Sequence, residues 1–418
     1  MVICVKFVYF PALKFLSDYT IIWGIKGHKS YIRRAAGKRT SGAVRRRRCV
    51  FRKAGISMNK PTRVALVTSG GDCQGLNAAM RGVAKSLFEH VEDLEIYGMY
   101  DGYRGLIERD YKFMEPKDFS GILTEGGTIL GTSRQRYIPG KDIVDEDGNS
   151  LIPAMLDTYN RLNLDCLVIM GGNGTQKSAK LLMDAGMNVI TLPKTIDNDI
   201  YGTDTTFGFQ SAVDIATNVI DYIHSTASSH GRIFVVELMG RDAGWLTLQA
   251  GIGSGADVIL IPEIPYDINK VAELIEKRRK KGRSFSIVAC AEGAVAKTDA
   301  VLDEETKRHM RENSSYPTVS YEIAAKLEAL TGQETRVTVP GHYQRGGPPC
   351  PYDRVLATQF GAAAAELIIN KQYGRMVAIQ GGNICSIPLE EAASRTKFLP
   401  VDHPLIKVAR DIGISFGD

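Results

Sequence analysis

The chain has 418 residues, of which 44% are hydrophobic and 24% are charged, and it contains 42 glycines. This composition is typical of a globular protein and excludes a disordered, collagen-like or purely fibrous chain, while the length predicts two domains. The net charge of +5 comes from residues 1–57, with 14 Lys and Arg against one acid; residues 58–418 hold 38 basic and 46 acidic side chains. Because this larger part is acidic, we expect no nucleic-acid partner.

Residues 1–57 form a basic N-terminal extension without a clean helical or strand period. Two interpretations remain open. The extension is an organelle-targeting segment, since such segments are rich in Arg and poor in acids, or translation of the native protein begins at Met58. The composition favours the second interpretation. In either case we expect the extension to be disordered or not translated, and to carry no chemistry.

The lengths of the apolar runs and the pattern of cysteines indicate the cell compartment of the protein. Lys6, Lys14 and Asp18 interrupt the most apolar region, so no uncharged stretch reaches the roughly 18 residues of a membrane span. The seven cysteines are odd in number and form no CxxC pair, which is typical of reduced thiols in the cytoplasm. We therefore expect a cytoplasmic protein without a membrane partner.

After the extension, short apolar strands alternate with Gly-rich turns and helical patterns. The first unit has an apolar strand in RVALVT, a glycine turn, and an amphipathic helix whose apolar face includes Leu76, Met80, Val83 and Leu87. Further strands are predicted, in chain order, in LEIYGMY, LDCLVIM, NVITL, RIFVVEL, DVILIPE, SFSIVACAEG and TRVTV. Nearly continuous apolar strands alternating with helices predict parallel sheets covered on both faces, with ligands at the carboxyl ends of the strands.

Two glycine loops follow strands and precede helices, the arrangement in which backbone N–H groups approach a phosphate. The first runs from Thr68 to Gly75 and the second from Met170 to Gln176. A tight turn without a ligand also requires glycine, so the first loop alone is equally consistent with a structural role. Two such loops facing one crevice instead indicate a polyphosphate ligand.

The most informative segment is PKTIDNDIYGTD, Pro193 to Asp204, directly after the run NVITL. Lys194 and Thr195 suit a phosphoryl group, and the carboxylates that follow suit proton transfer or a metal. An Asx-rich turn that caps the next helix is the structural alternative. We favour a functional loop, because a turn alone requires no cation beside the acids and the glycine loops.

Basic side chains also gather at the ends of two later strands. Arg232, Met239, Gly240 and Arg241 flank one strand, and Arg336, His342 and Arg345 flank the other. Each arginine alone is more often a surface ion-pair partner, and a single His is more often structural. Because Arg binds phosphate as a rigid fork, their clustering indicates a second anionic site.

Together these segments resemble the 6-phosphofructokinase family from about Arg63 to about Gly381. The motifs that carry the resemblance, in the family's order, are TSGGDCQGLNAAMRG, YDGYRGL, GGTILGTSR, GGNGT, PKTIDNDIYGTD, SSHGRI, VVELMGRDAGWL, CAEG, ETRVTVPGHYQRGG and YDRVLATQFGAAA. The resemblance implies two doubly wound α/β domains that enclose an active-site cleft. It implies a nucleotide domain at 58–208 plus 344–394 and a sugar-phosphate domain at 209–343 plus 395–418.

The resemblance also implies a reaction and residue roles. The γ-phosphoryl group of a nucleotide passes to the 1-hydroxyl of fructose 6-phosphate in glycolysis, with Asp197 as general base and Thr195, Arg241 and Arg134 holding the phosphoryl group. The implied nucleotide site is Gly71, Tyr103, Arg134, Gly172, Asn173, Gly174 and Thr175. The implied substrate site is Thr195, Asp197, Asp199, Met239, Gly240, Arg241, Glu292, His342 and Arg345, with Arg232 and Arg336 from a neighbouring subunit. A homo-oligomer, a tetramer or a dimer, follows from this sharing.

The sequence departs from the family's pattern in two places. Asn173 stands where the family usually has an Asp that serves Mg²⁺, so Asn173 is a weaker candidate metal ligand, and donor phosphates, water and other acids hold the cation. For the donor, Gly174 leaves room for a nucleotide, whereas Lys194 stands where pyrophosphate users carry Lys. We give Gly174 more weight, because a side chain in the path of a ligand excludes it more strongly than an extra cation does.

The sequence therefore predicts an enzyme that uses ATP with Mg²⁺ to phosphorylate fructose 6-phosphate to fructose 1,6-bisphosphate. A pyrophosphate-dependent fructose 6-phosphate 1-phosphotransferase is the alternative within the family. A non-catalytic member that only binds sugar phosphate is a further alternative, supported by the missing acid at Asn173. A dinucleotide-binding oxidoreductase is excluded because GGDCQG lacks the GxGxxG spacing.

Overall fold

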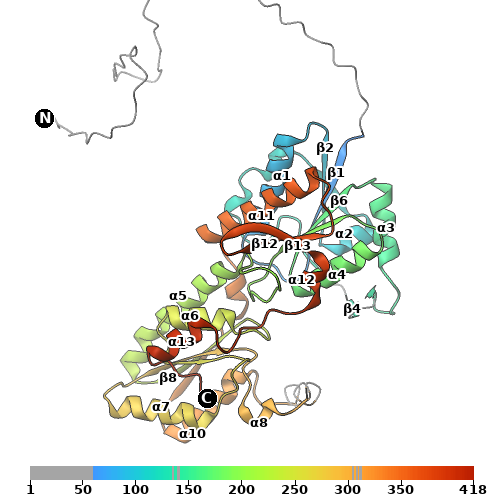
Figure 1. Ribbon diagram of the computed structural model, residues 1–418. Helices are drawn as coiled ribbons and strands as arrows, with labels where there is room; N and C mark the ends of the chain where they lie inside the picture. Colours follow the sequence, from blue (N-terminus) through green and yellow to red (C-terminus); the bar gives the residue numbers. More distant parts are fainter. Residues whose placement is uncertain (1–59, 134–135, 139–141, 304–305, 307–308, 310–312) are drawn as a thin grey trace, which may run out of the picture. The chain divides into compact units, whose positions relative to one another are not determined.

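The computed structural model describes residues 60–133, 136–138, 142–303, 306, 309 and 313–418. The predicted extension 1–57 and the candidate nucleotide ligand Arg134 therefore lie outside the described residues. The described chain belongs to one compact unit built on two large sheets with helices around them (Figure 1).

The first sheet has seven strands in the order β13-β12-β7-β6-β1-β2-β3. The strands are β1 (Thr62–Thr68), β2 (Leu94–Met99), β3 (Tyr111–Met114), β6 (Cys166–Gly171), β7 (Val189–Pro193), β12 (Arg375–Gln380) and β13 (Asn383–Pro388). The five inner strands run parallel, and β3 and β13 add to the two edges in antiparallel fashion. The register pairs Thr68 with Met170 and Gly171 with Pro193, so β1, β6 and β7 end at the same edge.

Helices cover both faces of this sheet. The inner strands carry apolar side chains at successive positions, so both faces of the sheet are apolar and need a cover. Val64 and Leu66 of β1 pack in one buried cluster with residues of two long helices, and Ala65 and Val67 pack on the opposite face with three shorter ones. The first pair is α1 (Leu76–His90) and α11 (Pro351–Ile369), and the shorter helices are α2 (Tyr103–Glu108), α3 (Ile152–Arg161) and α4 (Asn173–Asp184).

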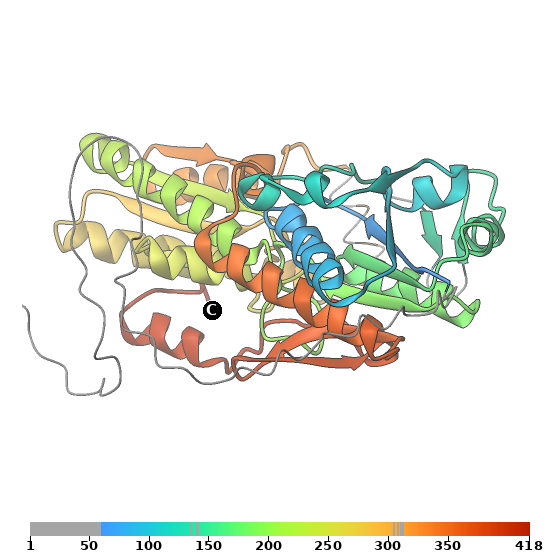
Figure 2. The same ribbon diagram turned by 90° about the horizontal axis from the view of Figure 1, so that it is seen from above.

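Helices α1 and α11 lie side by side (Figure 2), and glycines permit their close approach. A Cβ added to Gly82 would lie 2.8 Å from the Thr358 carbonyl oxygen, and one added to Gly361 would lie 2.4 Å from that of Ala79. Since Cβ atoms do not approach oxygens so closely, larger residues here would force the helices apart. These two glycines thus fix the helix pair on this face of the first sheet.

The second sheet has four parallel strands in the order β11-β8-β10-β9. They are β8 (Ile233–Leu238), β9 (Val258–Leu260), β10 (Ser286–Ala291) and β11 (Thr335–Thr338). Four helices surround it: α5 (Phe209–His230), α6 (Trp245–Gly253), α7 (Ile268–Lys280) and α10 (Val319–Thr331). Phe234 and Val236 of β8 join the cluster that contains α1 and α11, whereas Ile233 and Val235 pack with residues of α7 and α10.

Shorter elements complete the described chain. They are β4 (Arg136–Ile138), β5 (Asp142–Val144), α8 (Lys297–Ala300), α12 (Leu389–Ser394), α13 (Pro404–Asp411) and the 3₁₀ turns η1 (Pro116–Phe119), η2 (Ile122–Thr124) and η3 (Gly341–Arg345). Among the described residues, no helix has both the length and the apolar character that a membrane span requires.

The predicted fold class, two doubly wound sheets with mostly parallel strands, is confirmed. The domain boundaries at 208/209, 343/344 and 394/395 stay predictions, although the strands of each sheet fall within the ranges expected for them. Five strands had no prediction: β3, β4, β5, β12 and β13. Of these, β12 and β13 form a hairpin through Gly381 and Gly382, both at positive φ.

Candidate active site

Three loops that carry predicted site residues follow β7, β6 and β1, which are neighbours in the first sheet. Because these strands are parallel and end together, their loops meet at one edge, which is the usual ligand edge of such a sheet. A hydrogen bond of 3.4 Å from the Thr175 hydroxyl to the Ser69 hydroxyl joins the loops after β6 and β1. The two glycine loops therefore lie side by side, as the sequence predicted for a shared crevice.

The second glycine loop opens directly into a helix. Helix α4 begins at Asn173, so the unpaired N–H groups of its first turn belong to the GGNGT segment, and they favour an anion there. A Cβ on Gly171 would lie 2.3 Å from the Cβ of Thr175, so this position requires glycine. A Cβ on Gly174 would meet no atom within 4 Å, so Gly174 faces open space.

The first glycine loop is held differently. Helix α1 begins only at Leu76, after Gly75 at a φ of 96°. The Lys194 ammonium donates to the carbonyl oxygen of Ser69 at 3.0 Å and to that of Gly71. Lys194 is only 2% exposed, and burial lowers the pKa of its amine. Lys194 thus links the loop after β7 to the turn that contains Gly71.

The loop after β7 buries two carboxylates. Asp197 is 5% exposed, and its Oδ1 has no hydrogen-bond partner among the described residues; the same holds for Asp199 Oδ1. Burial and the charge of Asp197 raise the pKa of Asp199 to about 6. The Thr195 hydroxyl accepts from the Asp197 N–H at 3.1 Å, and Asn198 between the acids has a φ of 53°. Buried acceptors without protein partners are costly, so these two oxygens are available to a water molecule or a ligand.

Asn173 lies close to these acids. Its side-chain amide donates to the Thr396 hydroxyl at 2.6 Å, and a hydrogen bond to Asp199 lowers the pKa of that carboxyl. Asn173 Oδ1 is buried and has no partner among the described residues. An amide oxygen without a partner is a candidate ligand for a hard cation. Within the described part of the chain, however, no three His, Cys, Asp or Glu side chains are grouped to hold a metal by themselves.

The carboxyl ends of the second sheet supply the next group of residues. After β8, the N–H groups of Gly240 and Arg241 donate to Glu292 Oε1 at 3.2 and 2.8 Å. Burial raises the pKa of Glu292, whereas these two N–H groups favour its charged form. Arg241 and Glu292 also line a pocket of about 840 Å³. Glu292 thus fixes the backbone that carries Met239, Gly240 and Arg241.

The turn η3 connects this group to the first glycine loop. Arg345 donates to the Asp72 carbonyl oxygen at 2.9 Å. Gln74 donates to the carbonyl oxygens of Gln344 and Gly346 at 3.1 and 2.7 Å, and Gln344 Oε1 accepts from the Met239 N–H at 3.3 Å. Residues after β11 therefore contact the loop after β1, and both sheets direct their carboxyl ends to one region.

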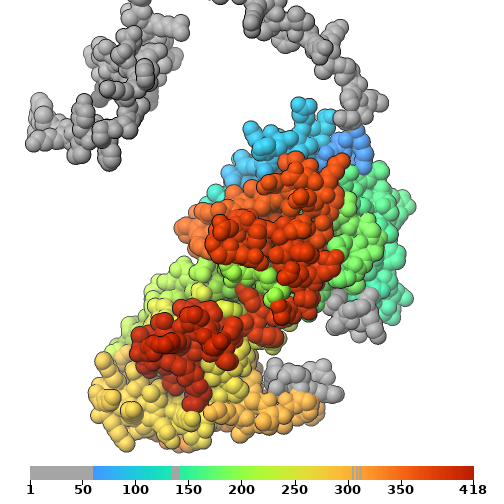
Figure 3. All heavy atoms as spheres, viewed as in Figure 1, coloured from blue at the N-terminus to red at the C-terminus, as the bar shows by residue number. Residues whose placement is uncertain are grey.

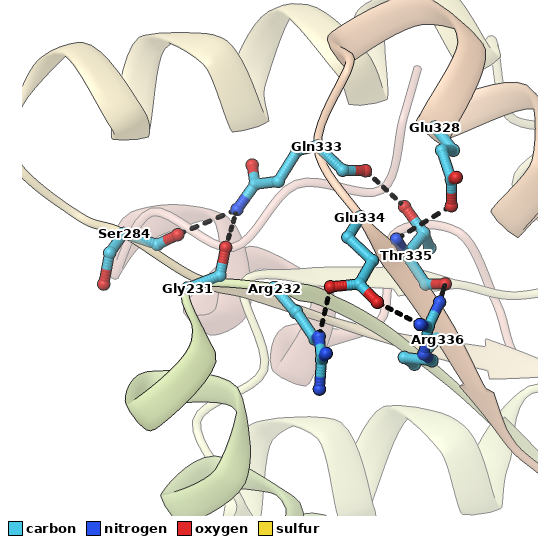
Figure 4. Close-up of polar contacts among 8 residues, drawn as sticks. All are labelled: Gly231, Arg232, Ser284, Glu328, Gln333, Glu334, Thr335 and Arg336. Atoms are coloured by element: carbon cyan, nitrogen blue, oxygen red, sulfur yellow. Dashed lines mark hydrogen bonds and ion pairs between the residues drawn. The ribbon is translucent and has the colours of Figure 1, made fainter.

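Arg232 and Arg336 lie apart from this region. Arg232 precedes β8, whereas Met239 follows the same six-residue strand, so about 20 Å of strand separates them. Both arginines bind one acid: Arg232 Nε lies 2.6 Å from Glu334 Oε2, and Arg336 pairs with Glu334 Oε1 (Figure 4). The expectation that they serve another subunit stays a prediction.

Two further predicted site residues, Tyr103 and His342, differ in their exposure to solvent. Tyr103 begins α2 and is 3% exposed within the core of the first sheet; its hydroxyl has no hydrogen-bond partner among the described residues. His342 is exposed on η3.

The sequence analysis did not identify several residues that hold the site together: Gln74, Trp245, Glu263, Gln344, Thr396 and Lys397. Each acts through contacts to loops far away in the chain, so no local motif marks it. The pairs of Gln74 with Gln344 and of Asn173 with Thr396 are separated by 270 and 223 residues.

Fold and site together define an α/β protein with two mostly parallel sheets, in which two glycine loops and a carboxylate-rich loop meet at the carboxyl ends of the strands of the first sheet. The sequence matches the phosphofructokinase family over residues 63–368, and the chain therefore belongs to this family.

Named relatives agree with this assignment. The chain is similar to the ATP-dependent 6-phosphofructokinase of Spirochaeta thermophila, at 54% identity over 357 residues, which are 84% of this chain and 97% of that protein. It is 48% identical over 373 residues to the ATP-dependent 6-phosphofructokinase of Propionibacterium freudenreichii, covering 85% of this chain and 99% of that protein. The structure of phosphofructokinase from Saccharomyces cerevisiae matches with a TM-score of 0.67 at 32% identity, covering 80% of this chain and 45% of that one.

Proposed function

We propose that the protein transfers the γ-phosphoryl group of ATP to the 1-hydroxyl of fructose 6-phosphate, forming fructose 1,6-bisphosphate in glycolysis. The observation that carries this proposal is the Asp197 carboxylate, which is buried in the loop after β7 and has an oxygen without a hydrogen-bond partner among the described residues. The names of the similar proteins, each called an ATP-dependent 6-phosphofructokinase, support the same reaction.

Asp197 acts as the general base. The free oxygen of Asp197 accepts the proton of the sugar's 1-hydroxyl. As the proton leaves, the hydroxyl oxygen attacks phosphorus, and the phosphorus–oxygen bond to the leaving diphosphate breaks. The raised pKa of Asp199, about 6, results partly from the charge on Asp197. Asp199 is proposed to contact the substrate beside the base.

The phosphoryl group is held by groups on both sides of the base. Thr195 already accepts from the Asp197 N–H, and Arg241 follows β8 on the backbone that Glu292 fixes. A positioned cation offsets the charge that spreads over the equatorial oxygens in the transition state. Arg134 is proposed to assist, and it lies outside the described residues.

The nucleotide is proposed to bind along the glycine loops. Its phosphates contact N–H groups at Gly71 and at Gly172, Asn173, Gly174 and Thr175, where α4 begins. Tyr103 is proposed to line the same site.

A Mg²⁺ ion bound with ATP would neutralise charge on the donor phosphates. Asn173 Oδ1 is the candidate protein ligand, because it is buried, without a partner among the described residues, and beside Asp199. Since the described residues group too few acids there to hold the ion alone, the donor phosphates and water would complete its coordination.

The sugar phosphate is proposed to bind at the carboxyl ends of the second sheet. Met239, Gly240 and Glu292 contact the sugar, and His342 and Arg345 contact its 6-phosphate. Of these residues only Glu292 lines the pocket of about 840 Å³ that Arg241 also lines; Met239, Gly240, His342 and Arg345 do not line it.

Arg232 and Arg336 are proposed to complete the same site in a neighbouring subunit, which requires a homo-oligomer, a tetramer or a dimer. Their position about 20 Å of strand away from Met239 supports such sharing. Light scattering of the purified protein tests this point: a monomer that is fully active would contradict it.

A cytoplasmic location is also proposed. The five cysteines among the described residues, Cys73, Cys166, Cys290, Cys350 and Cys385, are free thiols, as expected in a reducing compartment. Fractionation of the native cell tests it, and recovery of the protein in an organelle would contradict it.

The donor is the point at which the pyrophosphate alternative differs. Gly174 faces open space that a nucleotide can use, whereas the Lys194 ammonium is occupied by two backbone carbonyl oxygens. This arrangement supports ATP and explains why Lys194 need not indicate pyrophosphate. We test it by comparing ATP, GTP and pyrophosphate side by side as donors to fructose 6-phosphate. Turnover with pyrophosphate and none with ATP would overturn the proposal.

A further inference from the structure

The segment from Arg395 to Leu399, here called the crossover, connects α12 at the first sheet to α13 near the second. Figure 1 shows this part of the chain, coloured red, passing between the labels α12 and α13, and Figure 3 shows the C-terminal residues on the surface. Helix α13 packs on α6 of the second sheet, whereas α12 packs on α4 of the first. The crossover therefore extends past the carboxyl ends of both sheets.

On the first sheet's side, the crossover is bonded along the loop that carries the proposed base. Thr396 forms a bridge with Ile200, and the Lys397 N–H donates to the Asp199 carbonyl oxygen at 2.7 Å. The Thr396 hydroxyl also accepts from the Asn173 amide at 2.6 Å. These contacts attach the crossover to backbone and side chains on both sides of the two buried acids.

The Lys397 ammonium makes the most extensive of these contacts. It donates to Asn198 Oδ1 at 3.0 Å, to the Thr203 carbonyl oxygen at 2.9 Å and to the Asp204 carbonyl oxygen at 3.0 Å. Three acceptors use all three donors of an ammonium group. Asn198 directly follows Asp197 and has a left-handed backbone. Through the Asn198 side chain, Lys397 therefore holds the backbone next to the proposed base. Burial lowers the pKa of Lys397 to about 8, against the charges of Asp199 and Asp204, which raise it.

On the second sheet's side, the crossover is bonded to the start of α6. The Trp245 indole N–H donates to the Lys397 carbonyl oxygen at 3.1 Å, and the Lys397 ammonium lies 5.2 Å from the centre of the same indole ring. Glu263 Oε1 accepts from the N–H groups of Leu399 at 2.9 Å and Gly244 at 3.0 Å. Trp245 and Gly244 come only a few residues after Arg241. One residue, Lys397, is thus bonded both to the loop of the base and to the helix that follows the proposed phosphoryl-binding arginine.

We propose that Lys397 is a positioning residue for phosphoryl transfer, which holds the Asp197 loop in its catalytic geometry and in register with the Arg241 loop. This inference rests on the proposed function. Lys397 touches neither substrate nor phosphate in this role; its ammonium acts through Asn198 and its backbone through Asp199 and Trp245. A small displacement of a base or a phosphoryl-binding group reduces the rate steeply, whereas ground-state binding by other residues is retained.

The alternative is that the crossover has only a structural role and does not affect catalysis. In that case, removing the ammonium lowers the stability of the fold but leaves turnover of the folded enzyme intact. A positioning role instead separates kcat from the KM for fructose 6-phosphate, because Lys397 contacts Asp199 only through the backbone and, among the described residues, is not hydrogen-bonded to Met239 or Glu292, which are proposed to bind the sugar.

The test compares Lys397→Met with Lys407→Met in the full chain. Lys407 lies on α13, is exposed and, within the described chain, forms an ion pair only with Asp411 four residues away, so it controls for the loss of a C-terminal lysine. At a temperature well below both unfolding midpoints, we expect kcat of Lys397→Met to fall roughly 10- to 100-fold while the KM for fructose 6-phosphate changes less than about threefold. Lys407→Met should match the wild type. Unchanged kcat in folded Lys397→Met would overturn the proposal.

A second variant covers the case in which Lys397→Met does not fold. Trp245→Phe keeps an aromatic ring on α6 but removes the N–H that bonds to the Lys397 carbonyl oxygen, together with part of the indole surface. We expect a smaller loss of kcat, about 3- to 10-fold, again with little change in KM. Wild-type kcat in this variant, or a rise in KM alone, contradicts the positioning role. The wild-type assay separates the two claims, because a wild type that does not use ATP and fructose 6-phosphate fails the proposed function first.

Discussion

Replacing Asp199 with Asn should stabilise the protein near neutral pH. Asp199 is buried next to Asp197, and its pKa is raised from 3.8 to about 6. Between these two values the folded state binds more protons than the unfolded state, so the contribution of Asp199 to stability falls as the pH rises from about 4 to about 6. A shift of about two units at 1.36 kcal/mol each gives a penalty of about 3 kcal/mol above pH 6. Asn carries no charge and removes this penalty.

Urea unfolding at fixed protein concentration measures the effect at pH 4 and at pH 8. We expect Asp199→Asn to exceed the wild type in free energy of unfolding by about 2–3 kcal/mol at pH 8 and to match it near pH 4. Asp214→Asn is the control, because Asp214 is exposed on α5; it should change stability little at either pH. A difference that is the same at both pH values, or a destabilised variant at pH 8, would refute the burial argument.

Three further substitutions test separate parts of the site. Gly174→Asp should fold normally, since Gly174 faces open space, and it should lower kcat/KM for ATP by at least about tenfold, whereas Gly174→Ala should lower it less. Equal values of kcat/KM for the two variants would count against the steric argument. Gly171→Ala should lower the free energy of unfolding by about 1–3 kcal/mol in urea, because its Cβ would lie 2.3 Å from Thr175, and an unchanged midpoint would show that this turn can relax. Glu334→Gln should raise the KM for fructose 6-phosphate with little change in the urea midpoint, because Glu334 holds both Arg232 and Arg336; an unaltered KM would remove Glu334 from their positioning.

The sequence predicts best what is local or periodic. Continuous apolar runs predicted the parallel strands, because strands buried on both faces need apolar residues at every position, as Val64 to Val67 show. The glycine loops and the PKTIDND segment could be placed for the same reason, since each directly follows such a strand. The resemblance to the 6-phosphofructokinase family is confirmed by the family match.

Contacts between distant segments could not be predicted in this way. The hairpin of β12 and β13 lies at the edge of the sheet, where strands such as NICSIP are only partly buried and carry a weaker pattern. Lys194 looked like a phosphate ligand from its position, but its bonds to the carbonyl oxygens of Ser69 and Gly71 depend on how two loops meet. Lys397 has no motif at all, and its role emerges only when the crossover lies against the Asp197 loop.

The most direct test of the account is the effect of Asp197→Asn on phosphoryl transfer and on substrate binding, measured separately. Asn keeps the shape of the side chain but cannot accept the proton of the sugar hydroxyl. Single-turnover kinetics with ATP should show a rate lower by roughly 10²- to 10⁴-fold. Calorimetry should show fructose 6-phosphate binding within a few-fold of the wild type. A variant that transfers the phosphoryl group at the wild-type rate would contradict the assignment of Asp197 as the base.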